Sequence, residues 1–161
     1  MNKKYQSSSM GYWIIGFITV AVFAVIATIS FFGSAKSLSS KTNREIALTC
    51  TTDMATQFHI HPVLKIMIGD QLQEIPTNIG IKPDCMNSIH THDNTGVIHI
   101  EAPEKRDFNL SDFFAVWNKE INSFGKPIKM VVNGKENAEY ENYVMQDKDQ
   151  IELYYEQPQS Q

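Results

Sequence analysis

Apolar residues are spaced in three different ways along this chain, and each spacing predicts a different kind of element. The stretch 11–33 is almost entirely apolar, and no charged residue lies between Lys4 and Lys36. A membrane-spanning helix needs about 20 apolar residues. The segment 11–33 therefore predicts a transmembrane helix after a short tail, 1–10, with Tyr12 and Trp13 at one membrane interface.

A cleaved signal peptide is the main alternative for this segment. Gly33, Ser34 and Ala35 are small residues of the kind found at cleavage sites. Apolar regions of signal peptides run to about 7–15 residues, and the longer run here favours an uncleaved anchor. A buried helix of a soluble protein is the third interpretation.

The segment 34–45 is polar and lacks periodicity, which is typical of a tether. A globular domain is expected over 46–157. Near its start, residues 58–68 alternate between the two sides of a strand. Pro62 has no N–H to donate, so this strand should lie at a sheet edge or begin after the proline.

Turn-forming residues separate several further short apolar runs. Gly69 and Asp70 end the first strand, and Asn133-Gly134 predicts a tight hairpin. The runs "IHTH" and "VIHIE" flank "DNTG", which predicts a hairpin over 89–101. The alternating stretch 146–155 predicts the last strand.

Helical spacing occurs once after the membrane segment, between 109 and 121. Asn109 is placed to cap this helix, and Asp112 falls at the third helical position. The apolar residues at helical spacing are expected in the core: Leu110, Phe113, Phe114, Trp117 and Ile121. The predicted fold class is α+β: a transmembrane helix, then a small, mainly antiparallel β domain with one packed helix.

Charge and cysteine content bear on partners and compartment. Two of the 14 basic residues and none of the 18 acidic residues precede Lys36, so the remainder carries a net charge of −6. This acidity argues against nucleic acid as a partner. The basic residues flanking 11–33 do not decide its orientation, because both sides carry them.

Cys50 and Cys85 are the only cysteines, and an extracytoplasmic domain would most simply pair them in a disulfide. The expected location is therefore the cell membrane, with a single span and the C-terminal domain outside the cytoplasm. Two unpaired thiols, or two thiolate metal ligands, remain as alternatives.

All five histidines fall between residues 59 and 99. Residues two apart in a strand share a face, so His59 pairs with His61, and His90 pairs with His92. A four-residue "DNTG" loop would set His90 opposite His99, close enough to share an ion. A shorter "NTG" loop would place His99 on the other sheet face.

This clustering predicts a transition-metal site formed by His90, His92 and His99, with His59 and His61 completing or neighbouring it. Asp93 and Glu101 could bind the ion or orient a histidine ring. Imidazole suits copper and zinc. Copper is preferred for an extracytoplasmic protein with nearby methionines, which are Met54, Met67 and Met86.

Metal delivery, storage or sensing is the leading functional hypothesis. An accessory subunit with structural histidines, docked on a membrane complex through an edge strand or the helix aromatics, is the second. A metal-dependent enzyme is the third. No G-x-S-x-G, P-loop or dinucleotide-binding motif supports catalysis, and a Cys85–His90 nucleophile pair is only a minor alternative.

The chain also resembles a family of largely uncharacterised archaeal and bacterial proteins, often membrane-anchored or exported. The resemblance covers about residues 50–155. Its specific part is "HTHD" followed by "GVIHIE". The resemblance implies no enzymatic activity. Similar proteins often read H-x-H-x-H in the first motif, where this chain has Val63 at the third place.

Overall fold

The computed structural model describes residues 41–53 and 55–157. The predicted tail, the transmembrane helix and most of the tether lie outside these residues. Within the described part, no helix has the length and apolar character needed to cross a membrane.

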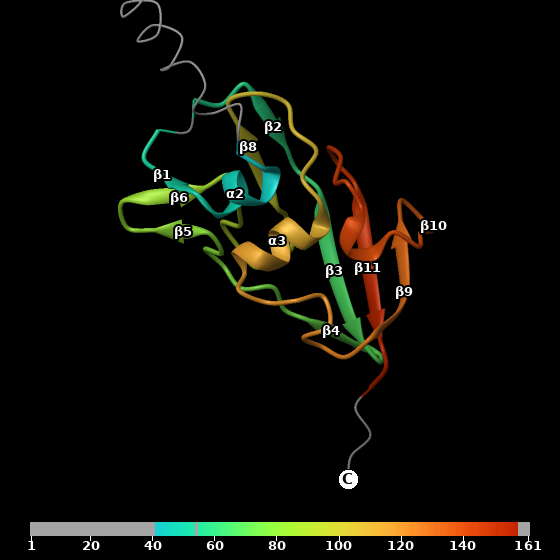
Figure 1. Ribbon diagram of the computed structural model, residues 1–161. Helices are drawn as coiled ribbons and strands as arrows, with labels where there is room; N and C mark the ends of the chain where they lie inside the picture. Colours follow the sequence, from blue (N-terminus) through green and yellow to red (C-terminus); the bar gives the residue numbers. More distant parts are fainter. Residues whose placement is uncertain (1–40, 54, 158–161) are drawn as a thin grey trace, which may run out of the picture. The chain divides into compact units, whose positions relative to one another are not determined.

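The described chain forms three small sheets (Figure 1). One sheet has the order β1 (Cys50–Thr51), β6 (Cys85–Asn87), β5 (Ile81–Lys82). The largest has the order β10 (Lys135–Glu136), β9 (Pro127–Val132), β11 (Gln150–Tyr155), β3 (Val63–Ile68), β4 (Gln71–Gln73). The third has the order β2 (Phe58–Ile60), β8 (His99–Ala102), β7 (Ile89–His90). The pairing is antiparallel except between β11 and β3, which confirms a mainly antiparallel α+β domain.

Pro62 divides the strand predicted over 58–68 into β2 and β3, which belong to different sheets. A proline cannot donate to a ladder, but its carbonyl oxygen accepts a hydrogen bond from the Ile98 N–H at 2.8 Å. The prediction that a strand begins after the proline is confirmed. The alternative prediction, one continuous strand over residues 58–68, is wrong.

The predicted hairpin at Asn133-Gly134 is confirmed, with both residues at positive φ between β9 and β10. Asp149, just before β11, is buried and holds this region together through its carboxylate. It accepts hydrogen bonds from Asn133 Nδ2 (2.8 Å), Tyr143 OH (2.7 Å) and the Gln146 N–H (2.8 Å).

A helix not predicted from the sequence, α2 (Asn43–Leu48), begins inside the residues assigned to the tether. Its start is a capping box: the Glu45 N–H donates to Thr42 Oγ1, and the Thr42 N–H donates to Glu45 Oε2. Arg44 also forms an ion pair with Asp112 at 2.8 Å. This short helix was missed because its stability comes from the cap and from packing rather than from a long apolar repeat.

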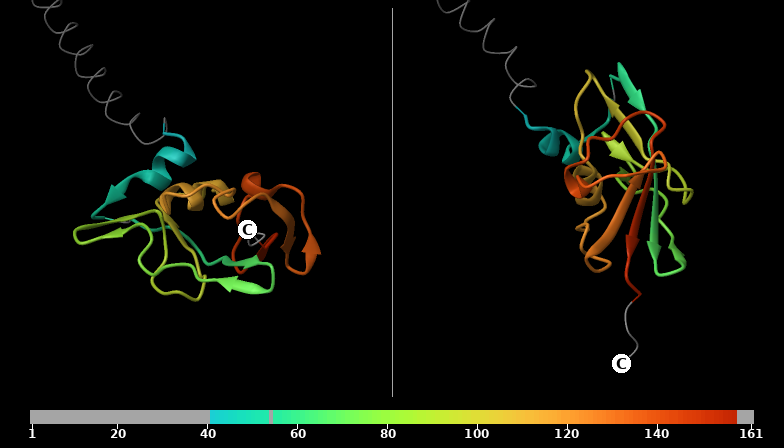
Figure 2. Two further views of the ribbon diagram at one scale, coloured as in Figure 1. Left: turned by 90° about the horizontal axis from the view of Figure 1, so that it is seen from below. Right: turned by 90° about the vertical axis from the view of Figure 1, so that its right-hand side faces the viewer.

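The predicted helix near 109–121 is confirmed as α3 (Leu110–Val116), and the Asn109 N–H donates to Asp112 Oδ2 at 2.9 Å. The helix ends earlier than expected because Asn118 adopts a left-handed conformation. Both helices lie on the same side of the strands (Figure 2). Phe113 and Phe114 are fully buried, which confirms them as core residues and removes them as a docking surface.

Candidate metal centre

His59, His90 and His99 lie on neighbouring strands of the β2–β8–β7 sheet, and His61 and His92 lie just beyond the ends of β2 and β7. On the central strand β8, His99 lies opposite His90 of β7, and Glu101 lies opposite His59 of β2. The β2 register, continued by one residue, sets His61 opposite His99. Side chains two apart share a sheet face, so these imidazoles gather on one face while the intervening Ile60, Ile89 and Ile100 are buried in the core.

His99 is the centre of this group. Its ring centroid lies 4.6 Å from that of His92, 4.7 Å from His61, 5.3 Å from His90 and 5.8 Å from His59. Two sets of three rings have ligand atoms within 4.8 Å of one another, a spacing that could hold a metal ion. We name them the His90 triad (His90, His92, His99) and the His59 triad (His59, His61, His99).

In the His90 triad, His90 is fully buried and its ring is fixed by the backbone. His90 Nδ1 lies 3.0 Å from the Asn87 carbonyl oxygen. A carbonyl only accepts, so Nδ1 carries the proton and Nε2 keeps its lone pair. His90 Nε2 lies 3.2 Å from His92 Nε2. Two nitrogens on one tetrahedral zinc ion at 2.0–2.1 Å would be about 3.3 Å apart, so the spacing suits a shared ion.

Thr91 holds the two histidines of "HTH" in place from the opposite side. It is fully buried, its hydroxyl donates to the Pro76 carbonyl oxygen at 2.9 Å, and it accepts from the Ile79 N–H at 3.1 Å. The Thr91 N–H also donates to the Ile79 carbonyl oxygen. Thr91 thus anchors this segment, while the two histidines on either side of it point the other way and present their rings.

The connection between β7 and β8 differs from the predicted four-residue loop, because the paired strands end at His90 and resume at His99. The expected pairing of His90 with His99 is confirmed. Val97 bridges Val63 instead of facing His92. Gly96 fixes this loop on β3: it has φ +86°, and its carbonyl oxygen accepts from the Leu64 N–H at 2.9 Å. A Cβ at Gly96 would lie 2.3 Å from the Leu64 carbonyl oxygen.

The His59 triad is more exposed and lies beside two acids. His59 Nε2 is 3.1 Å from Glu101 Oε1, and the His59 side chain is 42% exposed. The His61 N–H donates to Asp147 Oδ1 at 3.0 Å. Glu101 thus lies within ion-pair distance of the His59 ring. Asp147 was not identified from the sequence, because it comes from a distant loop.

Asp93 has a local role in the loop. Its Oδ1 accepts from the Thr95 N–H at 2.9 Å and from the Thr95 hydroxyl, and these hydrogen bonds lower the pKa of Asp93. The carboxylate is thus turned to the loop backbone, an Asx turn, rather than hydrogen-bonded to a ring.

Burial keeps the central imidazoles uncharged. Burial, followed by the nearby rings of His92 and His61, lowers the pKa of His99 to about 4. Burial also lowers the pKa of His90, although the hydrogen bond to Asn87 acts in the opposite direction. Both rings are therefore neutral at pH 7, which is the form that binds metal.

The predicted disulfide between Cys50 and Cys85 is confirmed. It excludes the two thiolate ligands and the Cys85 nucleophile. The bond joins β1 to β6, the strand that ends at Asn87, whose carbonyl fixes His90. Of the methionines, Met67 and Met86 lie on β3 and β6, outside the histidine-bearing sheet, and Met54 lies outside the described residues.

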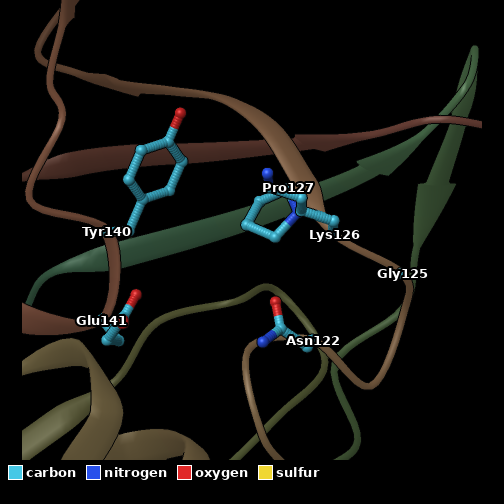
Figure 3. Close-up of a pocket in the computed structure, with 6 residues that line it drawn as sticks. All are labelled: Asn122, Gly125, Lys126, Pro127, Tyr140 and Glu141. Atoms are coloured by element: carbon cyan, nitrogen blue, oxygen red, sulfur yellow. The ribbon is translucent and has the colours of Figure 1, made fainter.

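A cavity of about 520 Å³ has none of the clustered histidines in its lining. Figure 3 shows Tyr140 and Glu141 on one side of it and Asn122, Lys126 and Pro127 on the other. A substrate held there would not contact the imidazoles that can bind metal, so this cavity gives no support to a metal-dependent enzyme.

Comparison with known family models, curated proteins and solved structures gives no match for this chain. The arrangement of the histidines therefore carries the functional argument.

Proposed function

We propose that this protein is a membrane-anchored, extracytoplasmic protein that binds a transition metal for delivery, storage or sensing. One observation carries the proposal: the other four imidazoles gather around His99, each with its ring centroid within 5.8 Å of the His99 centroid. If the histidines only formed a polar, solvent-exposed strand face, none of their rings would need to be buried and fixed by the backbone, as the ring of His90 is. Metal-binding histidines commonly have their second ring nitrogen held in this way.

Copper is the proposed metal, ahead of zinc. Imidazole nitrogen suits both ions, and the affinity of a given nitrogen site is normally greater for Cu²⁺ than for Zn²⁺. The disulfide supports an oxidising compartment, and the apolar segment 11–33 supports anchoring in the lipid bilayer. Anchoring is tested by washing membranes at alkaline pH: the chain should stay with the lipid, and release would contradict this part of the proposal.

The metal proposal is tested on the purified full chain by titration with Cu²⁺ and, separately, Zn²⁺. His99→Ala removes a ligand from both triads, so the affinity for the metal ion should fall by more than about 100-fold. Loss of a residue that only hydrogen-bonds a metal ligand already lowers the affinity by about 10- to 100-fold. Asn94→Ala, in the connection between β7 and β8 and without an imidazole, is the control and should bind normally. Unchanged binding by folded His99→Ala protein would overturn the proposal. Elemental analysis of protein from its native membrane identifies the metal.

A further inference from the structure

His99 belongs to both triads, and this shared ligand limits how they are used. The ligand atoms of each triad lie within 4.8 Å of one another, so the two ion positions are close neighbours. Two divalent ions repel about four times as strongly as two unit charges at the same distance. The imidazoles are neutral ligands that cannot offset this repulsion. The repulsion disfavours two ions at once, so one ion that uses either triad is the expected loading.

The two positions are not equivalent. The His90 triad has a buried ring fixed by Asn87 and a pair of nitrogens already at 3.2 Å. The His59 triad has no buried member, and its non-shared rings are 42% and 41% exposed. Glu101 lies beside it at 3.1 Å from His59, and its negative charge attracts a cation arriving from solvent.

We propose that the His59 triad is the exchange position through which an ion reaches and leaves the His90 triad. This inference rests on the proposed metal-binding function. The arriving ion binds His59, His61 and His99. It then keeps its bond to His99 while His90 and His92 replace the other two ligands. Release follows the reverse order, so the ion is never without a protein ligand.

Proton positions are consistent with this exchange. His90 Nε2 has a lone pair, so the 3.2 Å contact requires His92 Nε2 to donate its hydrogen in the metal-free protein. When the ion takes both nitrogens, the His92 proton moves to its other ring nitrogen through solvent, which reaches the exposed His92. Each ring stays neutral and no oxidant or reductant is needed.

The test measures how fast the full chain takes up and releases Cu²⁺. Stopped-flow absorbance follows loading, and excess EDTA follows release. His59→Ala/His61→Ala should still bind one ion with nearly unchanged affinity, but both loading and release should slow by about tenfold or more, because affinity is the ratio of the two rates. Asn94→Ala should keep the original rates. His59→Gln/His61→Gln repeats the test with bulkier side chains.

The reciprocal variant, His90→Ala/His92→Ala, should bind one Cu²⁺ more weakly and release it faster, since only the exposed triad remains. Unchanged rates in His59→Ala/His61→Ala, loss of its equilibrium binding, or two ions on the unmodified chain would each overturn the exchange position. These results differ from failure of the proposed function, in which the unmodified chain binds neither Cu²⁺ nor Zn²⁺, or His99→Ala binds them normally.

Discussion

Replacement of both cysteines by serine tests how strongly the disulfide supports the domain and the candidate metal centre. The bond closes a loop with a sequence separation of 35 residues. In the chain-entropy relation, a loop of this length corresponds to about 4 kcal/mol of unfolding free energy at 25 °C. This is a large share of the stability of a small domain, which is typically about 5–15 kcal/mol.

Urea unfolding of Cys50→Ser/Cys85→Ser and of the unmodified chain measures this loss. With a slope of about 2 kcal/mol per molar urea, the midpoint should fall by about 2 M. Both samples contain EDTA, because a bound ion would add its own stabilisation. A chemical reductant is avoided because thiols also bind metal. A midpoint shift below about 0.5 M, with an unchanged slope, would refute the reasoning.

The same variant tests the connection to the candidate metal centre. Strand β6 runs from Cys85 to Asn87, whose carbonyl oxygen fixes the His90 ring. Without the disulfide, this strand is held to β1 only by hydrogen bonds and packing. We expect Cu²⁺ affinity to fall by about tenfold, within the range for loss of a partner that orients a ligand. Titration below the unfolding midpoint measures it, and unchanged affinity would show that β6 needs no covalent support.

Three further predictions follow from particular residues. Gly96→Ala should lower the unfolding free energy, measured with urea, by at least about 3 kcal/mol, because the cost of positive φ and the cost of the 2.3 Å clash add. Gly134→Ala, the control at positive φ with nothing within 4 Å, should lower it by only about 1–2 kcal/mol. Equal losses in the two variants would contradict the clash. The pKa of His99 is about 4 in the folded chain and near 6.5 in the unfolded chain, so between these pH values the unfolded metal-free chain binds more protons. The contribution of His99 to the unfolding free energy is therefore fully present above pH 6.5, and the unfolding free energy should fall by about 1–2 kcal/mol toward pH 4 after allowance for solvent screening. The same dependence on pH in His99→Gln would refute this cause. Asp149→Ala leaves three donors without their acceptor and should cost about 2–4 kcal/mol, whereas the exposed Asp147→Ala should cost under about 1 kcal/mol; similar losses would argue against the buried network.

The elements predicted correctly are those specified by local chemistry. Asn133-Gly134 favours positive φ whatever surrounds it, and Asn109 with Asp112 caps a helix through contacts three residues apart. The parallel pairing of β11 with β3 joins distant segments, and nothing in either strand marks its partner. The change of sheet at Pro62 likewise depends on which strands lie nearby.

The proximity of the histidines was predictable for a similar reason. Residues two apart in an extended segment share a face, which brings together the two histidines of each H-x-H, and the β7–β8 register sets His90 opposite His99. The groups that support these rings were not predictable. Asp147 arrives from a separate loop, and Asn87 acts through its backbone carbonyl, which every residue possesses.

The use of imidazoles as the proposed ligands would have a consequence for recognition. A site built from carboxylates cancels the charge of the ion it binds, whereas histidine ligands leave that charge in place. Uptake of a divalent cation would thus turn this patch of an acidic protein electropositive. Loaded and empty chains would differ in electrophoretic mobility, and an anionic surface on another molecule would attract only the loaded one.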